Sequence, residues 1–338
     1  MAPSMMVTPE FVGGGRVRFV ERAVPEPGEG QLLLRLRANA LCGSERGQFQ
    51  QGSTVTPGHE AAGEVAAAGP GAETPVGANG VVFLMDFCGV CRACRLGFTN
   101  QCHHKRGDFG FSRDGGYGPY ALVRESAFFT TGDVAGAEAT LLLDVMGTGG
   151  HAVGRACLAR PDIESLLISG AGPIGLGALA MAKLLLGHSV PVAIADYDPI
   201  RLKLAEELGG LPVALADESL DAGLARAGVS PDAAIDTTGK QAARQSAMAA
   251  LARRGVLVCV GHGEGLTLDV SSDLIAPERA VLGSEYFRFD ELPGNLLLFH
   301  EHRDYLRRII THRFPAARIE EAFETFFAGG TGKVVIEQ

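Results

Sequence analysis

Residues 166–175 read LLISGAGPIG, and an apolar stretch continues from there as far as Leu186. The first part is a short apolar run of the kind that forms a buried strand, and glycines at 170, 172 and 175 follow it directly. In such a G-x-G-x-x-G turn, Gly170 permits the tight bend, Gly172 lets the backbone approach a diphosphate, and Gly175 packs helix on strand. Pro173 and Ile174 begin the helix that follows. The stretch therefore predicts a dinucleotide site at a helix N-terminus.

The next apolar run, residues 192–195, ends in Asp196. An acid at this place accepts hydrogen bonds from the ribose hydroxyls of an adenine nucleotide and repels a 2′-phosphate. The sequence thus favours NAD over NADP, the alternative being that Asp196 is a solvated acid at a strand end. Arg201 is either a neighbour of the adenine or an ordinary arginine on a helix surface.

Further apolar runs of similar length follow at 213–215, 233–235 and 256–260, with helical patterns between them. This alternation predicts a parallel sheet of βαβ units, and it stops near Ser271. Residues 1–150 are rich in glycine and in short alternating runs, which predicts a β-rich domain. The tail has helical stretches at 296–310 and 319–327 and a last strand at 333–336. We therefore expect domains at 1–150 and 151–275 and a C-terminal segment at 276–338.

Composition narrows the possible functions. A chain of 338 residues exceeds the size of one hydrophobic core, so two domains are expected. The net charge of −9 and the lack of a basic cluster argue against nucleic acid as a partner. The longest apolar stretch, 174–186, contains Lys183 and is too short to span a bilayer. Because the N-terminus has no secretory pattern either, we expect a cytoplasmic protein without membrane contact.

Four of the seven cysteines are crowded between residues 88 and 102, at positions 88, 91, 94 and 102. Four thiolates at this spacing suit a tetrahedral zinc ion whose shell they close, which predicts a structural rather than a catalytic metal. Unrelated cysteines and an iron–sulfur cluster are the weaker alternatives.

A second and open metal site is suggested by Cys42 and His59. Cysteine and histidine together form part of many catalytic zinc sites, in which a third protein ligand leaves one coordination position for substrate. Spacing alone does not separate this interpretation from that of two packing residues.

Taken together, these motifs resemble the zinc-dependent medium-chain dehydrogenases, which include alcohol, sorbitol and threonine dehydrogenases. The resemblance covers nearly the whole chain. It rests on Cys42-Gly43-Ser44, on Gly58-His59-Glu60 with Gly63, on the four cysteines, on Asp144 to Ala152, on the glycine turn with Asp196, and on the closing run Gly332 to Ile336. It implies an α/β protein in which a GroES-like catalytic domain carries the zinc lobe (88–102), a Rossmann domain is inserted, and the tail completes the catalytic domain.

The resemblance also implies roles for individual residues. Cys42, His59 and Asp144 match the ligands of a catalytic zinc, Asp144 being otherwise a helix N-cap. Glu60 matches a carboxylate that approaches this metal or stands behind it, and Ser44 matches the hydroxyl that takes the substrate's proton, an ordinary turn serine being the alternative. The implied cofactors are two zinc ions per chain and NAD, and the implied assembly is a homodimer or homotetramer.

Two positions depart from the family pattern. Glu45 stands where relatives usually carry an aspartate that orients the zinc-bound histidine, and Gly47 stands where many carry a histidine that passes the proton to solvent. The expected function is NAD-dependent oxidation of a secondary alcohol or polyol, or reduction of the matching ketone. The alternative is a zinc- and NAD-binding homologue without turnover, acting as a sensor or structural protein. A zinc-free NADPH-dependent reductase would explain neither the cysteines nor Asp196.

Overall fold

The glycine turn lies in a six-stranded parallel sheet. The structure is a computed structural model that describes residues 2–338, and the strand order in this sheet is β12-β11-β10-β13-β14-β15. The strands are β10 (Leu166–Ser169), β11 (Val192–Asp196), β12 (Leu211–Ala214), β13 (Ala233–Asp236), β14 (Val256–Cys259) and β15 (Ala280–Gly283). The order reverses beside β10, and ligands of such sheets bind at this switch point, outside the carboxyl ends of the strands.

Helices cover both faces of this sheet, so its strands are buried on both sides. Leu166 and Ile168 of β10 contribute to one core and Leu167 to the other, because neighbouring side chains of a strand point to opposite faces. The helices are α4 (Gly149–Ala159), α5 (Pro173–Leu185), α6 (Pro199–Glu207), α7 (Leu220–Ala227) and α8 (Gln241–Ala250). Continuous apolar runs such as LLI are the expected sequence of strands in this setting.

The sixth strand, β15, lies beyond the point where the sequence pattern predicts the alternation to stop. It pairs in parallel with β14 from Val256↔Ala280 to Cys259↔Gly283. The expectation that the βαβ alternation ends near Ser271 is therefore wrong. Residues 260–279 contain only a short π-helical turn, Val270–Ile275, instead of a long amphipathic helix. The hydrophobic pattern of this segment therefore does not predict the strand that follows.

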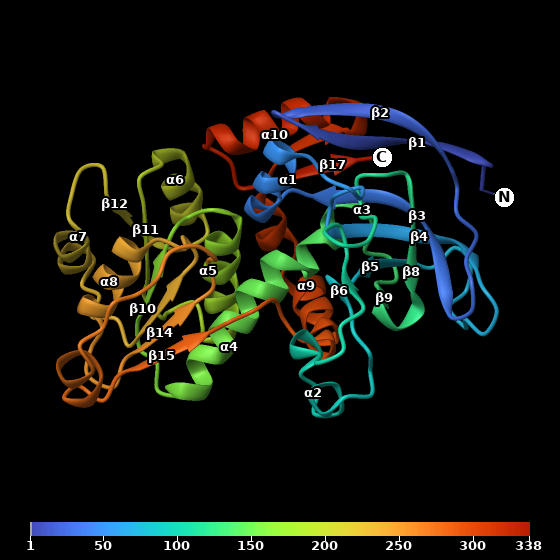
Figure 1. Ribbon diagram of the computed structural model, residues 1–338. Coiled ribbons are helices and arrows are strands. Elements are labelled where there is room, and N and C mark those ends of the chain that lie inside the picture. Colours follow the sequence, from blue (N-terminus) through green and yellow to red (C-terminus); the bar gives the residue numbers. More distant parts are fainter. Residues whose placement is uncertain (1) are drawn as a thin grey trace.

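The other half of the molecule is built on a seven-stranded sheet of order β16-β17-β3-β4-β5-β9, with β8 also paired to β3. Its strands are β3 (Gln31–Ala40), β4 (Glu60–Ala68), β5 (Asn79–Val82), β8 (Tyr120–Arg124), β9 (Phe128–Thr130), β16 (Ile310–Pro315) and β17 (Lys333–Glu337). Two smaller pairs accompany it: the hairpin β1 (Met5–Gly13) with β2 (Arg16–Ala23), and β6 (Met85–Asp86) with β7 (Gly107–Asp108). The C-terminal segment thus completes the N-terminal sheet, and helix α10 (Ile319–Ala328) lies beside the β1–β2 hairpin (Figure 1).

The helices of this half are mostly short: α1 (Arg46–Gln51), α2 (Arg92–Arg95), α3 (Gly136–Ala139), α9 (Leu292–Leu306) and α10 (Ile319–Ala328). Helix α9 begins four residues before the predicted start at 296, with Pro293 in its first turn, where proline is well tolerated. It ends at Leu306, and Ile310 already belongs to strand β16. The predicted helix at 296–310 is therefore displaced toward the N-terminus.

An aromatic cluster joins the two halves. The ring of Phe83, just after β5, packs edge-on against Phe287 and Phe289, which follow β15, with ring centroids 5.2 Å and 5.5 Å away. Phe87 completes the cluster at 5.7 Å from Phe83. Among residues 2–338, no helix is both long enough and apolar enough to cross a bilayer.

Candidate active site and metal centres

Strand register brings the ends of three distant segments to one point. Strands β3 and β4 are antiparallel with Ala40 opposite Glu60, so Cys42 lies just past the end of β3, and His59 immediately precedes β4. Strand β17 pairs with the other side of β3 with Val335 opposite Ala40, and the same register continued places Lys333 opposite Cys42. The Leu41 amide donates to the Val334 carbonyl at 2.8 Å and holds this register.

Four predicted residues meet there. Cys42, His59, Glu60 and Asp144 each offer one ligand atom, and these four atoms lie within 4.8 Å of one another. All but Cys42 are buried, and His59 Nε2 is 3.5 Å from Asp144 Oδ2. One thiol, one imidazole and two carboxylates in such a group are donors that suit zinc.

Asp144 reaches the cluster from an unusual turn. Residues Asp144–Thr148 form a π-helical turn directly before α4, a geometry that is rare and frequent at functional sites. The Thr148 hydroxyl donates to Asp144 Oδ1 at 2.8 Å, which leaves Oδ2 facing His59. Leu143 is the N-cap of this turn and Thr148 that of α4, so Asp144 is the N-cap of neither, contrary to the helix N-cap alternative.

Glu45 and Tyr117 fix the orientation of His59 from behind. Glu45 Oε1 lies 2.9 Å from His59 Nδ1, so Nε2 is the ring atom directed at Cys42 and Asp144. Tyr117 donates its hydroxyl proton to Glu45 Oε2 at 2.6 Å, and the Tyr117 ring stacks on Phe11 with centroids 5.9 Å apart. Glu45 therefore contacts His59 with one carboxylate oxygen, and the Tyr117 hydroxyl holds the other.

Glu60 is held from the opposite side by a buried lysine. The ammonium group of Lys333 donates to Glu60 Oε1, and both side chains are fully inaccessible to solvent. Glu60 Oε2 has no hydrogen-bond partner among the described residues. A buried carboxylate oxygen without a partner is costly, and a cation in the cluster would satisfy it.

The electrostatics of the cluster favour a cation. Burial opposes a charge on His59, but Asp144, Cys42 and Glu45 outweigh it and raise its pKa well above the usual value. Burial would likewise raise the pKa of Asp144, yet His59, Lys333 and Thr148 hold it well below its usual range. Burial raises the pKa of Glu60 to about 8, with Lys333 pulling the other way and Asp144 adding to the rise. These shifts share one cause, the crowding of acidic groups around His59, and a zinc ion held by them would supply the positive charge that they favour.

Ser44 and Gly47 follow Cys42 closely in the sequence, and both are exposed. Ser44 belongs to the short helical turn Gly43–Glu45, two residues after Cys42, and its side chain is exposed. A Cβ on Gly47 would meet no atom within 4 Å, so the backbone there borders open space.

The four predicted lobe cysteines also come together. The sulfur atoms of Cys88, Cys91, Cys94 and Cys102 lie within 4.8 Å of one another, and the cysteines are free thiols rather than disulfides. Backbone amides of Val90 and Cys91 point at Cys88 Sγ at 3.4 Å and 3.3 Å. A hydrogen bond from the Cys94 backbone amide is the main reason that the pKa of Cys91 falls to about 5. Amide donors thus favour the thiolate form of Cys88 and Cys91, whereas burial raises the pKa of Cys94 to about 12.

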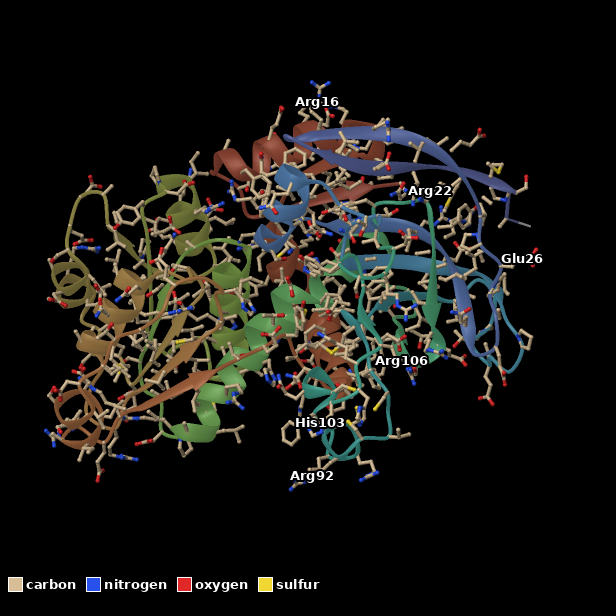
Figure 2. All side chains as sticks on the ribbon, in the orientation of Figure 1. Arg16, Arg22, Glu26, Arg92, His103 and Arg106 are labelled. Atoms are coloured by element: carbon tan, nitrogen blue, oxygen red, sulfur yellow. The ribbon has the colours of Figure 1, made fainter. Side chains whose placement is uncertain are left out.

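His103 stands next to Cys102 in the sequence but is not part of this group. Figure 2 shows His103 and Arg92 extending from the lobe, and both are exposed. The sulfur-only cluster therefore has the composition that the sequence predicts.

The glycine turn has the geometry expected of a dinucleotide site. Gly170 has φ +94°, and a Cβ on Gly175 would lie 1.8 Å from the Gly170 carbonyl oxygen, so both positions require glycine. A Cβ on Gly172 would meet nothing within 4 Å, which leaves the space over the N-terminus of α5 open. Asp196 ends β11 and accepts a hydrogen bond from Ala171 N at 2.6 Å, so its carboxylate lies directly against the turn.

Arg201 points elsewhere in this structure. It lies on α6, its Nε donates to the Thr331 carbonyl at 3.0 Å, and it lies 3.9 Å from Asp198. The guanidinium thereby connects α6 to the loop before β17. Its predicted contact with an adenine ring remains a prediction.

Two residues of the cluster's surroundings, Lys333 and Tyr117, are missed by the sequence reasoning. Lys333 had a usable signal, because a lysine that begins an apolar strand such as KVVI is buried only when it is paired. The sequence holds no such signal for Tyr117, since its hydroxyl contacts Glu45, which lies 72 positions away in the chain.

Replacing Tyr117 by phenylalanine should weaken metal binding at Cys42 and His59 by about tenfold or more, because an outer hydrogen bond that orients a metal-bound histidine would lose its support. The ring would still pack against Phe11 and Phe323, so the fold should persist. Zinc release to a competing chelator measures the effect. Tyr305→Phe is the matched control, because its hydroxyl donates to the Leu208 carbonyl away from the cluster. Equal release from both variants would contradict the role given to Tyr117.

Comparison with known proteins agrees with this architecture. Residues 28–133 match the family described as alcohol dehydrogenase GroES-like domain, and residues 173–301 match the family described as zinc-binding dehydrogenase. The chain is similar to an L-threonine 3-dehydrogenase of Saccharopolyspora erythraea, with 30% identity over 95% of both chains. It is 28% identical to an uncharacterised zinc-type alcohol dehydrogenase-like protein of Escherichia coli over 98% of both chains. An L-galactonate-5-dehydrogenase of Escherichia coli is 29% identical over 90% of both chains.

Solved structures show the same fold. An alcohol dehydrogenase from Escherichia coli in complex with NADH superposes with a TM-score of 0.88 at 21% identity, covering 99% of this chain and 100% of the other. A zinc-binding dehydrogenase from Sinorhizobium meliloti bound to NADP gives a TM-score of 0.85 at 25% identity, with coverage of 99% and 100%. The chain belongs to the zinc-dependent medium-chain dehydrogenase family.

Proposed function

We propose that this protein is an NAD-dependent dehydrogenase that oxidises a secondary alcohol or polyol, or reduces the matching ketone. The observation that carries the proposal is the cluster of Cys42, His59, Glu60 and Asp144, with Ser44 exposed beside it. Family membership makes the protein an oxidoreductase, and the cluster supplies the place where the chemistry would occur.

Cys42, His59 and Asp144 would hold the catalytic zinc, and the four lobe cysteines would hold a second, structural one. When bound, the catalytic zinc supplies a Lewis acid for the substrate oxygen and NAD accepts a hydride from the carbinol carbon. Ser44 accepts the proton of the substrate hydroxyl, and water in the open space at Gly47 carries it to solvent. Tyr117 and Glu45 keep His59 oriented, and Lys333 keeps Glu60 Oε1 engaged on the side away from substrate.

The preference for NAD rests on Asp196. Its carboxylate lies against the glycine turn, where the adenosine ribose of a dinucleotide would be held, and a negative charge there repels a 2′-phosphate. The similar fold in complex with NADH supports this assignment, whereas the Sinorhizobium protein was bound to NADP, so the charge at this position needs a direct test.

Asp196→Ser should lower the ratio of catalytic efficiencies for NAD over NADP by about tenfold or more, since both the ribose contact and the repulsion disappear. Initial rates with the two coenzymes at a fixed alcohol concentration give the ratio. Asp304→Ser serves as control, because it removes an exposed carboxylate on α9. An unchanged ratio would mean that coenzyme choice is made elsewhere.

The names of the relatives favour a small polar substrate. The proteins from Saccharopolyspora and Escherichia coli are named for L-threonine and L-galactonate, each a secondary alcohol with further polar groups. A secondary alcohol or polyol that carries further polar groups is therefore the substrate class proposed for this chain.

The test is formation of NADH with a panel of secondary alcohols and polyols, run on protein whose zinc content has been measured. Two zinc ions per chain and turnover of at least one compound are expected. Two zinc ions and tight NAD binding without any turnover would instead favour a sensor or structural homologue, which the open position at Gly47 makes the second candidate. If the unmodified chain and a Cys42→Ala variant both held a single zinc ion, the proposed catalytic site would lose its support.

A further inference from the structure

One loop of the C-terminal segment contacts both the helix that follows Asp196 and the metal cluster. Residues 329–332 connect α10 to β17, and β17 begins with Lys333, whose ammonium group donates to Glu60. At its other end the loop lies against the N-terminus of α6, close to the end of α10 (Figure 1). A short series of contacts therefore joins the site proposed for the coenzyme to the site proposed for zinc.

Asp198 makes the contact on α6 and uses both of its carboxylate oxygens. Its Oδ1 caps the helix by accepting from the amides of Ile200 at 2.9 Å and Arg201 at 3.3 Å. Its Oδ2 accepts from the Gly330 amide at 2.5 Å. Burial would raise the pKa of Asp198, but the amides of Gly330, Arg201 and Ile200 hold it below its usual value. A helix cap needs only one oxygen, so the second oxygen serves the contact with the loop.

The loop has a backbone shape that lets it approach α6. Gly329 and Gly330 have φ +93° and +69°, and a Cβ on Gly329 would lie 3.2 Å from Asp198 Oδ2. Arg201 Nε donates to the Thr331 carbonyl at 3.0 Å and forms a second contact with the same helix. The loop also borders a cavity of about 200 Å³. Hydrogen bonds, rather than close packing, therefore hold the loop on this side.

From Thr331 onward the chain is buried as far as the metal cluster. Thr331 is 2% exposed, and the Gly332 amide donates to Thr311 Oγ1 at 3.0 Å. Lys333 follows directly and is inaccessible to solvent, as is its partner Glu60. Because packed interiors transmit strain, a displacement of the loop acts on the backbone that carries Lys333 and, through it, on Glu60.

On the coenzyme side, Asp196 is joined to the same segment. Its Oδ1 accepts from the amides of Tyr197 at 2.7 Å and Asp198 at 2.9 Å, and its Oδ2 accepts from the Ala171 amide of the glycine turn at 2.6 Å. A ribose held by Asp196 would therefore restrain residues 196–198. A ligand that orders one segment lowers the cost of ordering the contacts that the segment makes, which couples two sites without a change of overall shape.

We infer that Asp198 is a positioning residue that connects the ribose site at Asp196 to the Lys333–Glu60 pair, so that a nucleotide bound at the glycine turn stabilises the metal cluster. The inference rests on the proposed function, because it takes the glycine turn as the coenzyme site and the cluster as a zinc site. Such coupling is reciprocal, so bound zinc should strengthen nucleotide binding by the same factor.

The probe for this coupling is ADP. It carries the adenosine ribose and the diphosphate but no nicotinamide, so any effect on the metal cluster must pass through the protein. In the zinc-loaded unmodified protein, saturating ADP should slow the release of the cluster's zinc to a competing chelator by about fivefold or more. Release from the lobe should not change, and a Cys42→Ala protein, which keeps only the lobe ion, identifies that phase.

Asp198→Asn should reduce the effect of ADP to less than about twofold. Asparagine is an equally good N-cap, so α6 keeps its cap, but the amide nitrogen cannot accept from Gly330. Asp269→Asn is the matched control, because Asp269 caps the turn at 270–275 by accepting from the Ser272 amide at 2.9 Å. This control should show the full effect of ADP.

Hydrogen exchange supplies a readout that a helix cap alone would not change. ADP should slow exchange of the Gly330 amide in the unmodified and Asp269→Asn proteins and should leave it unchanged in Asp198→Asn. Calorimetric titration of ADP into all three proteins sets the saturating concentration, so the comparison is made between proteins that are equally occupied.

The outcomes separate this inference from the proposed function. If ADP binds but changes neither zinc release nor exchange at Gly330, or if Asp198→Asn retains the full effect, the inference alone is overturned. If ADP does not bind, the coenzyme site of the proposed function is overturned and this inference with it. If no alcohol is turned over, the coupling is still measured and decided, because neither readout uses the reaction.

Discussion

Lys333→Met is expected to lower the free energy of unfolding by about 3 kcal/mol, because the fully buried Glu60 carboxyl loses its hydrogen-bond partner and avoids an unpaired charge only by taking up a proton. The two side chains are inaccessible to solvent, and burial already raises the pKa of Glu60 to about 8 with the lysine present. Urea unfolding monitored by circular dichroism, at a fixed zinc concentration, gives the difference.

Two controls separate this effect from simple loss of a lysine. Lys240→Met breaks an exposed pair with Glu264, whose nitrogen and oxygen are 3.0 Å apart, and should cost less than about 1 kcal/mol. The double variant Lys333→Met with Glu60→Gln removes both charges and should recover most of the stability. A Lys333→Met protein as stable as the unmodified chain would show that the pair is not buried as described.

Cys42→Ala is expected to abolish catalysis in practice, lowering kcat by about 1,000-fold or more, because a Lewis acid contributes several kcal/mol to such a reaction. The zinc content should fall from two ions to one, since the lobe cysteines form a separate group that Cys42 does not belong to. Metal analysis and NADH formation on the same sample provide both readouts.

Cys157→Ala is the matched control for this loss, because Cys157 is a free, half-buried thiol on α4 that belongs to neither cysteine-containing cluster. It should retain both zinc ions and its activity. Full activity of Cys42→Ala would remove Cys42 from the catalytic site, whatever its place in the structure.

The features that sequence predicts well are those whose chemistry is local. The turn from Gly170 to Gly175 and the cysteines between 88 and 102 carry their geometry within a few residues, so spacing is informative. The strand β15 was missed because its four residues follow a long irregular segment without periodicity. The predicted helix at 296–310 extends too far because apolar residues continue from the end of α9 into β16, so the sequence does not mark where the helix ends.

The surroundings of the metal cluster could not be predicted in the same way. Tyr117 contacts Glu45, and Lys333 contacts Glu60, only because β3 pairs with β4 on one side and with β17 on the other. Such contacts depend on strand register across the whole chain, and a single sequence holds no periodic signal for them. Glu45, by contrast, was expected near His59 from the family pattern, and it does make that contact.

The pairing of β17 with β3 has a consequence for biosynthesis. Glu60 leaves the ribosome early, and its partner Lys333 is 273 positions further along the chain. While translation continues, the nascent β3 edge lacks its neighbour and the carboxylate has no counter-charge. The Glu60 side of the metal cluster can therefore be completed only after Lys333 has been made, and zinc captured earlier would go first to the lobe, whose four thiols are all made within a short interval.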